Sequence, residues 1–442
     1  MTQRTSPELL RAAIFHTPRN PFRHDNALES FSDGGLLIEN GRIAACGDYA
    51  SLVTAHPRVR TRDLRGGFLL PGFVDAHVHY PQVRILGGLG YSLLDWLEHH
   101  ALPEEAKFSA SEYAQAVASE FVHALVSHGT TTALVFGSHF PQAVAILFET
   151  AAHAGLRIVS GLVISDRRLR PELHVDAETA YQTNRQLIRC FHGRGRALYA
   201  VTPRFALSAS EALLEVCQTL LTEHPGLRFQ THLNESAPEI AGIRRLFPWA
   251  SDYLEVYEHF HLISPRSVLA HSVHSSRPEL ERIAAAGSYV AHCPSSNAAL
   301  GSGIFSMRCH VEAGVGCSLG TDVGGGTGFG MLKEGLQAYL MQRLANSSGA
   351  ALSPAHLLYL VTRAGAEAIG LENEIGDFQR GKSADFVYVK PPAGSPLQAV
   401  AAHAASAGHL LGSIFTLADA ETVSETWVGG APVFRHADHG RN

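Results

Sequence analysis

The sequence lacks the features that mark secreted, membrane-bound or nucleic-acid-binding proteins. None of its six cysteines forms a pair with CxxC spacing, and a chain of 442 residues does not depend on a disulfide framework, so we expect reduced thiols. No run of about 18 apolar residues is present, and the first 20 residues hold no apolar stretch of signal-peptide length. A net charge of −6 leaves no basic surface for nucleic acid. These absences predict a cytoplasmic protein with no membrane span and no nucleic-acid partner.

The composition is that of a large globular protein with many histidines. Hydrophobic residues make up 45% of the chain and charged residues 17%, which supplies a sizeable core and excludes disorder as the main state. At roughly 100–200 residues per domain, the length suggests two or three domains, or one large barrel with an appendage. The 26 histidines favour a metalloenzyme, because histidine is a common metal ligand and proton carrier.

Short strand-like segments occupy both ends of the chain. Asn40-Gly41 is typical of a tight hairpin turn between strands at residues 35–39 and 42–46. Strand-like segments return at residues 375–380, 384–389 and 425–434. Neither end can bury a core alone, so we expect both to pair in one composite β-sandwich domain. The predicted boundaries are residues 1–67 and 372–442 for this β domain and 68–371 for the region between them.

The central region alternates short apolar runs with amphipathic helical stretches. Helices at residues 111–127 and 141–154, with others like them, separate eight strand candidates, which is typical of an α/β protein with a (β/α)8 TIM-like barrel. The candidates are residues 69–79, 131–136, 157–164, 197–202, 227–232, 267–271, 288–292 and 315–320. Active sites of such barrels lie at the C-terminal ends of the strands, so the residues that end these runs are the first candidates for chemistry.

Polar residues follow the apolar run at six of the eight predicted strand ends. His77 and His79 end the first strand, and residues two apart in a strand point to the same side, so both can bind one metal ion. His232, at the end of the fifth strand, and Asp322, after the eighth, complete a set of three nitrogens and one oxygen. This set is typical of catalytic Zn²⁺ with a water in the open position, and similar ligands accept Fe²⁺. A hydrogen-bonded core position is the alternative for each histidine alone, but it does not explain why all of them fall at strand ends.

The scarcity of lysine limits the number of metal ions. The four lysines are Lys107, Lys333, Lys382 and Lys390. None lies on a predicted barrel strand, so a two-metal site bridged by a modified barrel lysine is excluded and one Zn²⁺ per chain is expected. The HExxH motif is absent. A second HxH pair, His259 and His261, follows a helical stretch where the two side chains diverge, and we expect it to face solvent.

Several motifs resemble the amidohydrolase superfamily of metal-dependent hydrolases. PGFVDAHVH at residues 71–79 resembles its strand-one motif, and GKSADF at residues 381–386 resembles its C-terminal β motif. Further pieces, along nearly the whole chain, resemble the members that deaminate guanine: HYPQ (79–82), LLDWL (93–97), TPRF (202–205), THLNE (231–235), HCPSSN (292–297) and GTDVG (320–324). The HxH and HCPxSN pieces are shared with triazine and thioadenosine-type deaminases, whereas Gln82 and the Pro-Arg-Phe piece are more particular to guanine deamination.

The resemblance implies hydrolysis of guanine to xanthine and ammonia in purine catabolism. The implied Zn²⁺ ligands are His77, His79, His232 and Asp322. Asp322 would also take a proton from the attacking water, and Glu235 would protonate a ring nitrogen and then the leaving amine. His271 would hydrogen-bond the attacking oxygen. A surface helix cap is the alternative role for Glu235, and a structural position is the alternative for His271. The family typically forms dimers, so a homodimer is expected.

Recognition of guanine as a small-molecule substrate needs donors for O6 and N7 and an acceptor for a ring N–H. Arg204 offers forked donors, and Gln82 offers a donor and an acceptor from one amide. Phe205 and Trp96 offer aromatic surface for the ring face. Trp96 lies in an apolar segment, so core packing explains it equally well.

Two other functions stay open from the sequence alone. A related deaminase or chlorohydrolase would act on another aminated heterocycle, such as 8-oxoguanine, a triazine or a nucleoside, and the pair Gln82 and Arg204 argues against it. A catalytically inactive relative would serve as a binding or scaffolding protein. Such proteins usually lose metal ligands, and none of the predicted ligands is missing.

Overall fold

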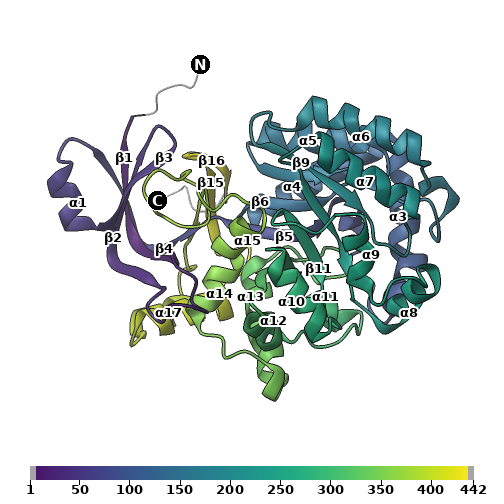
Figure 1. Ribbon diagram of the computed structural model, residues 1–442. Helices are drawn as coiled ribbons and strands as arrows, with labels where there is room; N and C mark the ends of the chain where they lie inside the picture. Colours follow the sequence, from purple (N-terminus) through teal and green to yellow (C-terminus); the bar gives the residue numbers. More distant parts are fainter. Residues whose placement is uncertain (1–5, 437–442) are drawn as a thin grey trace.

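Two sheets organise the computed structural model, which describes residues 6–436 (Figure 1). One is a parallel barrel, and the other is a mixed sheet built from both ends of the chain. In Figure 1 the purple N-terminal strands lie at one end of the molecule, and the helix-covered barrel forms the rest. The predicted α/β class, the TIM-like barrel and the composite β domain are confirmed.

Within residues 6–436, eight parallel strands form the barrel. They are β5 (Phe73–His79), β6 (Thr130–Phe136), β7 (Arg157–Gly161), β9 (Ala197–Pro203), β10 (Arg228–Leu233), β11 (Ser267–His271), β12 (Tyr289–His292) and β13 (Gly316–Leu319). The two edges of this sheet meet through backbone hydrogen bonds from His79 N–H to the Val323 carbonyl (3.0 Å) and from Asp322 N–H to the His77 carbonyl (2.8 Å). The closure therefore places the end of the first strand beside the end of the last.

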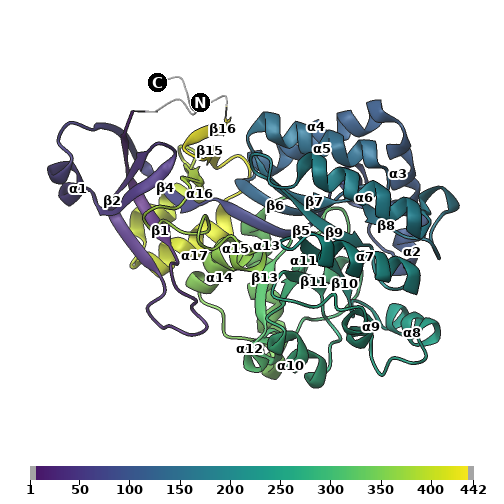
Figure 2. The same ribbon diagram turned by 45° about the horizontal axis from the view of Figure 1, so that its top comes forward.

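Amphipathic helices cover the outside of the barrel. Figure 2 shows α4, α5 and α6 on one side of the strands and α10 and α12 on the opposite side. The helices of this region are α4 (Ser111–Ser127), α5 (Pro141–Ala154), α6 (Ala177–Phe191), α7 (Glu211–Glu223), α8 (Ala237–Leu246), α9 (Tyr253–His259), α10 (Arg277–Ala285), α11 (Pro294–Ala299), α12 (Met307–Ala313), α13 (Met331–Leu344), α14 (Pro354–Val361) and α15 (Arg363–Ala368). In α4 the buried Val117, Phe121 and Leu125 recur every four residues, as a helix with one apolar face requires. Among residues 6–436, no helix is both long and apolar enough to cross a membrane.

The segment between β5 and α4 is a chain of short helices. It contains η1 (Tyr80–Ile85), α2 (Leu93–Trp96), the π-helical turn η2 (Leu97–Ala101), α3 (Leu102–Ala106) and η3 (Lys107–Ser109). Two further short turns, η4 (Pro171–Leu173) and η5 (Asn346–Ser348), lie in later connections. Single π-turns occur frequently at functional sites, and η2 lies directly between two segments that contribute to the site described below.

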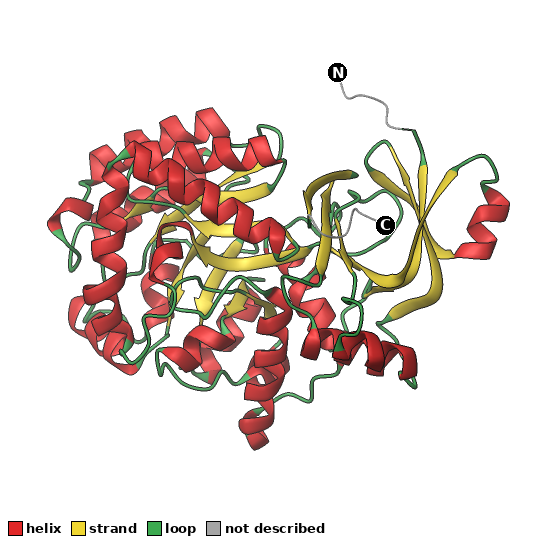
Figure 3. Ribbon diagram, turned by 180° about the vertical axis from the view of Figure 1, so that it is seen from behind, coloured by secondary structure: helices red, strands yellow, loops and turns green. Residues whose placement is uncertain are grey.

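The mixed sheet joins the two ends of the chain in the order β16-β15-β14-β4-β1-β2-β3. Its strands are β1 (Glu8–His16), β2 (Glu29–Glu39), β3 (Arg42–Asp48), β4 (Arg60–Pro71), β14 (Phe386–Val389), β15 (Val423–Val428) and β16 (Ala431–Arg435). Helices α1 (Tyr49–Ala55), α16 (Pro396–His403) and α17 (Ala407–Leu417) complete this part. The view from behind in Figure 3 shows this strand-rich part, in yellow, beside the helix-covered barrel. β14 pairs with β4 in antiparallel register, so the C-terminal strands lie directly against the N-terminal ones.

In the structure, each of two predicted strands is divided into two separate strands. Residues 69–79 were predicted as one strand, but the chain leaves the mixed sheet at Pro71 and enters the barrel at Phe73. Gly72 makes the transition, because a Cβ there would lie 2.2 Å from Thr131 Oγ1. Residues 157–164 likewise divide into β7 and the two-residue β8 (Val163–Ile164), which pairs with β9.

Two predictions at the C-terminal end need correction. Residues 375–380 form no strand, because Gly376 has a φ of 95° and the backbone N–H of Phe378 donates to His16 Nδ1 rather than to a neighbouring strand. Residues 425–434 are a hairpin, with β15 and β16 joined by Gly429 and Gly430 at φ of 59° and 73°. Positive φ at both turn residues is what a two-residue hairpin of this kind requires, and glycine adopts it without strain.

Candidate active site at the C-terminal ends of the barrel strands

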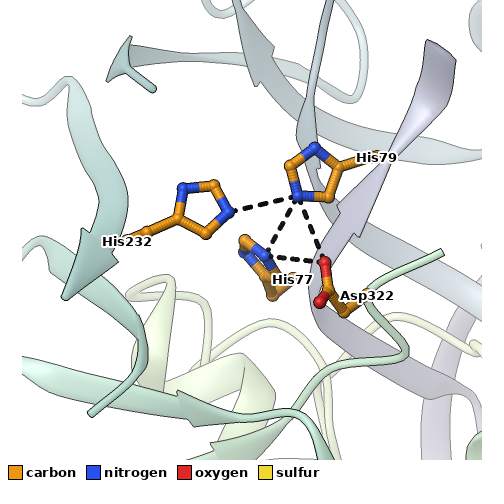
Figure 4. Close-up of side chains that lie close together, drawn as sticks. All are labelled: His77, His79, His232 and Asp322. Carbon is orange, nitrogen blue, oxygen red and sulfur yellow. Dashed lines mark hydrogen bonds and ion pairs between the residues drawn. The ribbon is translucent and has the colours of Figure 1, made fainter. Parts of the chain in front are cut away.

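The four predicted metal ligands converge at the mouth of the barrel (Figure 4). Asp322 Oδ1 lies 3.2 Å from both His77 Nε2 and His79 Nε2, and these two nitrogens are 3.2 Å apart. His232 Nε2 lies 3.3 Å from His79 Nε2. The donor atoms of all four buried residues lie within 4.8 Å of one another. Three imidazole nitrogens and one carboxylate oxygen form a set that could hold a metal ion.

The protonation of the histidines fits metal binding. His232 Nδ1 lies 2.6 Å from the Arg204 carbonyl oxygen, which only accepts, so Nδ1 carries the hydrogen and Nε2 presents a lone pair to the cluster. Burial lowers the pKa of His79 to about 4 and lowers the pKa of His77 and His232 as well. These rings are therefore neutral near pH 7, which is the form that ligates metals.

A second donor set overlaps the first. His271 and Cys293, together with His77 and Asp322, also place one donor atom each within 4.8 Å. Burial raises the pKa of the Cys293 thiol well above its ordinary value, and the thiol faces the Ala291 carbonyl at 3.7 Å. A protonated thiol is a poor ligand, so the set with His79 and His232 is the stronger candidate.

Strained backbone positions cluster at the strand ends that carry these residues. Asn234, His271, Ser272 and Asp322 all have positive φ, between 49° and 72°. Residues other than glycine rarely adopt this region, and such positions concentrate at functional sites. Asp75 supports the same strand ends from within β5, because its carboxylate accepts hydrogen bonds from Thr321 N–H (3.0 Å) and His77 N–H (3.2 Å).

Glu235 and His271 face each other beside the metal-ligand cluster. His271 Nε2 lies 3.4 Å from Glu235 Oε2 and 3.8 Å from Asp322 Oδ2, so it stands between the two carboxyl groups. His271 Nδ1 is held by Asn297 Oδ1 at 3.0 Å, and Ser302 Oγ donates to Glu235 Oε1 at 3.1 Å. Burial, followed by the charge of Asp322, raises the pKa of Glu235 to about 8.

The helix-cap interpretation of Glu235 does not match its contacts. The capping box of α8 is made by Ser236 and Glu239, and the Glu239 carboxylate accepts the backbone N–H groups of Glu235 and Ser236. The side chain of Glu235 instead faces Ser302 and His271. Its carboxyl group is therefore directed into the site.

A small cavity lies next to the metal-ligand cluster. All the predicted substrate-binding residues and all the predicted catalytic ones line it, whereas His77 lies outside its lining. The lining residues are His79, Gln82, Leu93, Trp96, Leu97, Arg204, Phe205, His232, Glu235, His271, Leu300 and Asp322. Trp96 is buried and also lines the cavity, so core packing and an aromatic wall are both part of its environment.

A carboxylate behind the cavity, Glu105, was not predicted from the sequence. Glu105, on α3, accepts hydrogen bonds from Arg204 Nη1 at 2.8 and 2.6 Å and from Gln82 Nε2 at 2.8 Å. Its Oε2 also lies 3.2 Å from His139 Nε2. His139 follows the end of β6, so inspection of every strand end would have identified it. Glu105 lies on a short helix before α4, where no pattern in the sequence distinguishes it from a surface acid.

The second HxH pair lies away from the site, as predicted. His259 and His261 are both exposed, and the His259 ring packs on Trp249 with centroids 4.5 Å apart. The glycine-rich run at residues 324–328 forms a loop after β13 rather than the start of a helix. Neither feature contributes a donor to the cluster.

Comparisons with known proteins agree on one family. The model of the amidohydrolase family matches residues 68–433, and a model of the imidazolonepropionase-like composite domain of bacteria matches residues 34–58. A probable guanine deaminase of Deinococcus radiodurans is 55% identical over 432 residues, which is 97% of this chain and 98% of that protein. The guanine deaminase of Escherichia coli K12 is 39% identical over 423 residues, which is 95% of each chain. The crystal structure of guanine deaminase from Bradyrhizobium japonicum superimposes with a TM-score of 0.94 at 34% identity and covers 98% of this chain and 100% of that one.

Proposed function

The chain belongs to the amidohydrolase family, and we propose that it is a zinc-dependent guanine deaminase that hydrolyses guanine to xanthine and ammonia in purine catabolism. The observation that carries the proposal is one cavity, in which the metal-ligand cluster, the pair Glu235 and His271, and the pair Gln82 and Arg204 meet. The similarity to guanine deaminases over nearly the whole chain supports the choice of substrate.

Four residues would hold a single Zn²⁺ ion: His77, His79, His232 and Asp322. When bound, the ion supplies Lewis-acid activation of the attacking water. Asp322 has a second role in this proposal, because its Oδ2 faces His271 rather than the other ligands and can take the proton that the water loses. His271 would hydrogen-bond the attacking oxygen, and Asn297 fixes the orientation of its ring.

Glu235 would move protons on the substrate. Attack of water oxygen at C2 of guanine pushes an electron pair onto ring N3, and Glu235, protonated up to about pH 8, would donate its proton there. The C2–N bond then breaks, and the amino group must leave as ammonia because the amide anion is a very poor leaving group. The proton that Asp322 took from the water would then reach the ionised Glu235, which would pass it to this nitrogen. The remaining hydroxyl proton on C2 would return to Glu235 as the C2 carbonyl of xanthine forms, so that both carboxyl groups end in their starting states. The sum is guanine and water giving xanthine and ammonia.

The fastest test of the function is ammonia release from guanine by the purified protein, with adenine, cytosine and ammeline as controls. Release from guanine alone supports the proposal. Faster release from ammeline or another heterocycle would assign the chain to a different deaminase of the family. The absence of any release from protein that contains its metal would instead favour a binding role.

Metal removal is expected to stop the reaction reversibly. Dialysis against a chelator should lower the metal content and the ammonia release together, because the proposed chemistry needs the Lewis-acid activation of water that the metal supplies. Adding back one equivalent of Zn²⁺ should restore both. Metal content is measured by elemental analysis, and full turnover by metal-free protein would contradict the proposal.

Changing Arg204 to lysine is expected to weaken guanine selectivity. Lysine keeps a positive charge near Glu105 but lacks the forked donors that match two adjacent acceptors such as O6 and N7. kcat/KM for guanine should fall by roughly 30-fold, the size expected when a charged hydrogen bond is lost, with metal content unchanged. kcat/KM for 2-aminopurine, which lacks O6, should fall much less. An equal loss on both substrates would show that Arg204 does not recognise O6.

The assembly and the location of the protein are also part of this proposal. We propose a cytoplasmic homodimer without membrane or nucleic-acid partners. The free thiols support the location, the acidic balance of the sequence argues against a nucleic-acid partner, and the homodimer rests on the resemblance to a family that typically forms dimers. Light scattering coupled to gel filtration measures the mass in solution. A monomer would overturn the dimer without affecting the proposed chemistry.

A further inference from the structure

We propose that Glu105 is a positioning residue for purine recognition, which fixes the side chains of Gln82 and Arg204 from outside the cavity. The inference rests on the proposed function, because it concerns the residues that would bind guanine. It adds a specificity-determining group that lies outside the cavity lining and touches two residues that lie within it.

The contacts of Glu105 join two separate strand ends. Gln82 lies on η1 after β5, and Arg204 follows β9, so the two side chains extend from separate elements and a contact between them must set how they are oriented toward each other. Both oxygens of Glu105 accept from Arg204 Nη1, at 2.8 and 2.6 Å, and Oε1 also accepts from Gln82 Nε2 at 2.8 Å. The side chains of Arg204 and Glu105 are 4% and 3% exposed, so water does not compete for these bonds.

Glu105 also decides which way the Gln82 amide faces. Burial alone would favour the neutral acid, but the Arg204 guanidinium lowers the pKa of Glu105 below its usual range, so the carboxylate can only accept. On the other side of the amide, the backbone N–H of Gly324 donates to Gln82 Oε1 at 3.0 Å. A carboxylate on one side and an N–H on the other permit only one of the two amide orientations. The remaining N–H and lone pair of Gln82 are therefore fixed before a ligand arrives.

The same carboxylate limits which part of Arg204 is engaged. Both bonds to Glu105 use Nη1, which leaves the rest of the planar fork for the cavity that Arg204 lines. An unpaired buried guanidinium would be costly, so the counter-ion both stabilises the cation and sets its direction. Prior orientation of polar groups in this way removes an ordering cost from substrate binding.

The segment from α2 to α3 connects Glu105 to the wall of the cavity. Leu93, Trp96 and Leu97 line the cavity from α2 and the start of η2, and Glu105 follows on α3 a few residues later. His139, from the end of β6, closes the far side of the carboxylate, and burial lowers the pKa of its ring so that it is neutral. The buried group therefore contains one negative and one positive charge, on Glu105 and Arg204.

The test compares Glu105→Gln with a control at the adjacent residue. Glutamine keeps the shape but replaces one acceptor by an NH₂ group, which must face a donor of Arg204 or Gln82. We expect kcat/KM for guanine to fall by about 10- to 100-fold, mainly through KM, with metal content unchanged. Glu104→Gln is the matched control, because Glu104 is a buried acid on the same helix that bonds Lys107 Nζ at 2.7 Å and the Tyr113 hydroxyl instead. We expect the control to stay within about twofold of the unmodified protein.

A double variant separates positioning from general damage. Because Glu105 acts partly through Arg204, Glu105→Gln combined with Arg204→Lys should lose clearly less than the product of the two single losses, and the further loss that remains is the part that acts through Gln82. Losses that multiply in full, or an unchanged KM in Glu105→Gln, would overturn the inference. Glu105→Asp keeps the charge with a shorter reach, so its kcat/KM for guanine should fall less than that of Glu105→Gln. This variant also tests the inference if Glu105→Gln folds poorly. If the unmodified protein fails to deaminate guanine, the proposed function itself is refuted. If the unmodified protein is active and Glu105→Gln is equally active, only the role of Glu105 is refuted.

Discussion

Replacing Asp322 with alanine is expected to abolish both metal retention and deamination. Asp322 Oδ1 lies 3.2 Å from the Nε2 atoms of His77 and His79, and the loss of Asp322 removes the anionic member of a set whose other donors are neutral imidazoles. The same change removes the oxygen that faces His271 and would take the proton of the attacking water. The measurement is metal content per chain together with ammonia release from guanine.

The backbone at Asp322 calls for a second variant. Asp322 has a φ of 49°, a conformation that asparagine tolerates and alanine adopts with strain. Asp322→Asn therefore keeps the local conformation and removes the charge. We expect it to fold like the unmodified protein and to lack activity, with weakened zinc binding. Near-normal turnover with zinc retained in this variant would refute the assignment of Asp322 as ligand and base.

Much of the architecture could be predicted because the physical signals were local. Barrel strands are buried on both faces and appear as short apolar runs such as Thr130–Phe136, and the helices between them show one apolar face. The two predicted helices at residues 111–127 and 141–154 have the same bounds in the structure. The segment at residues 375–380 was wrongly predicted as a strand because its apolar residues are buried without being extended. Phe378 packs in the core of the mixed sheet and Ile375 among barrel-strand residues, while Gly376 turns the chain out of extended conformation.

The position of the metal-ligand cluster was predictable for a topological reason. Parallel strands of a barrel all end at one rim, so polar residues at successive strand ends must lie near one another, however far apart they are in sequence. That argument led to His77, His232 and Asp322, which the structure brings together. Their roles in catalysis stay predictions until the variants are measured.

The supporting residues could not be predicted by the same reasoning. Glu105 and Asn297 lie on short helices, and their importance comes only from which side chains they touch in the folded protein. A sequence pattern gives the direction of a side chain along its own element, whereas these contacts depend on how separate elements pack.

Replacing Glu235 with glutamine is expected to separate binding from chemistry. The amide keeps the size of the side chain and can still accept a hydrogen bond from Ser302, but it cannot deliver a proton to ring N3 or to the leaving amine. kcat should fall by about 10²-fold or more, while the metal content stays unchanged and KM changes little. Glu239→Gln is the control, because the amide oxygen of glutamine can still accept the backbone N–H groups at the start of α8, so kcat should change much less than in Glu235→Gln.

The pH dependence of the reaction tests the role of Glu235 as an acid in a second way. Burial raises the pKa of Glu235 to about 8 from an ordinary value of 4.5, so the side chain holds its proton at neutral pH and loses it as the pH rises through 8. kcat/KM of the unmodified protein, which reports groups of the free enzyme, should therefore decline above about pH 8, because only the protonated form can act as the acid. The residual activity of Glu235→Gln should lack this decline, since glutamine does not titrate. If kcat barely changes in the variant, or if its alkaline decline persists unaltered, another group transfers the protons and Glu235 is a structural residue of the cavity wall.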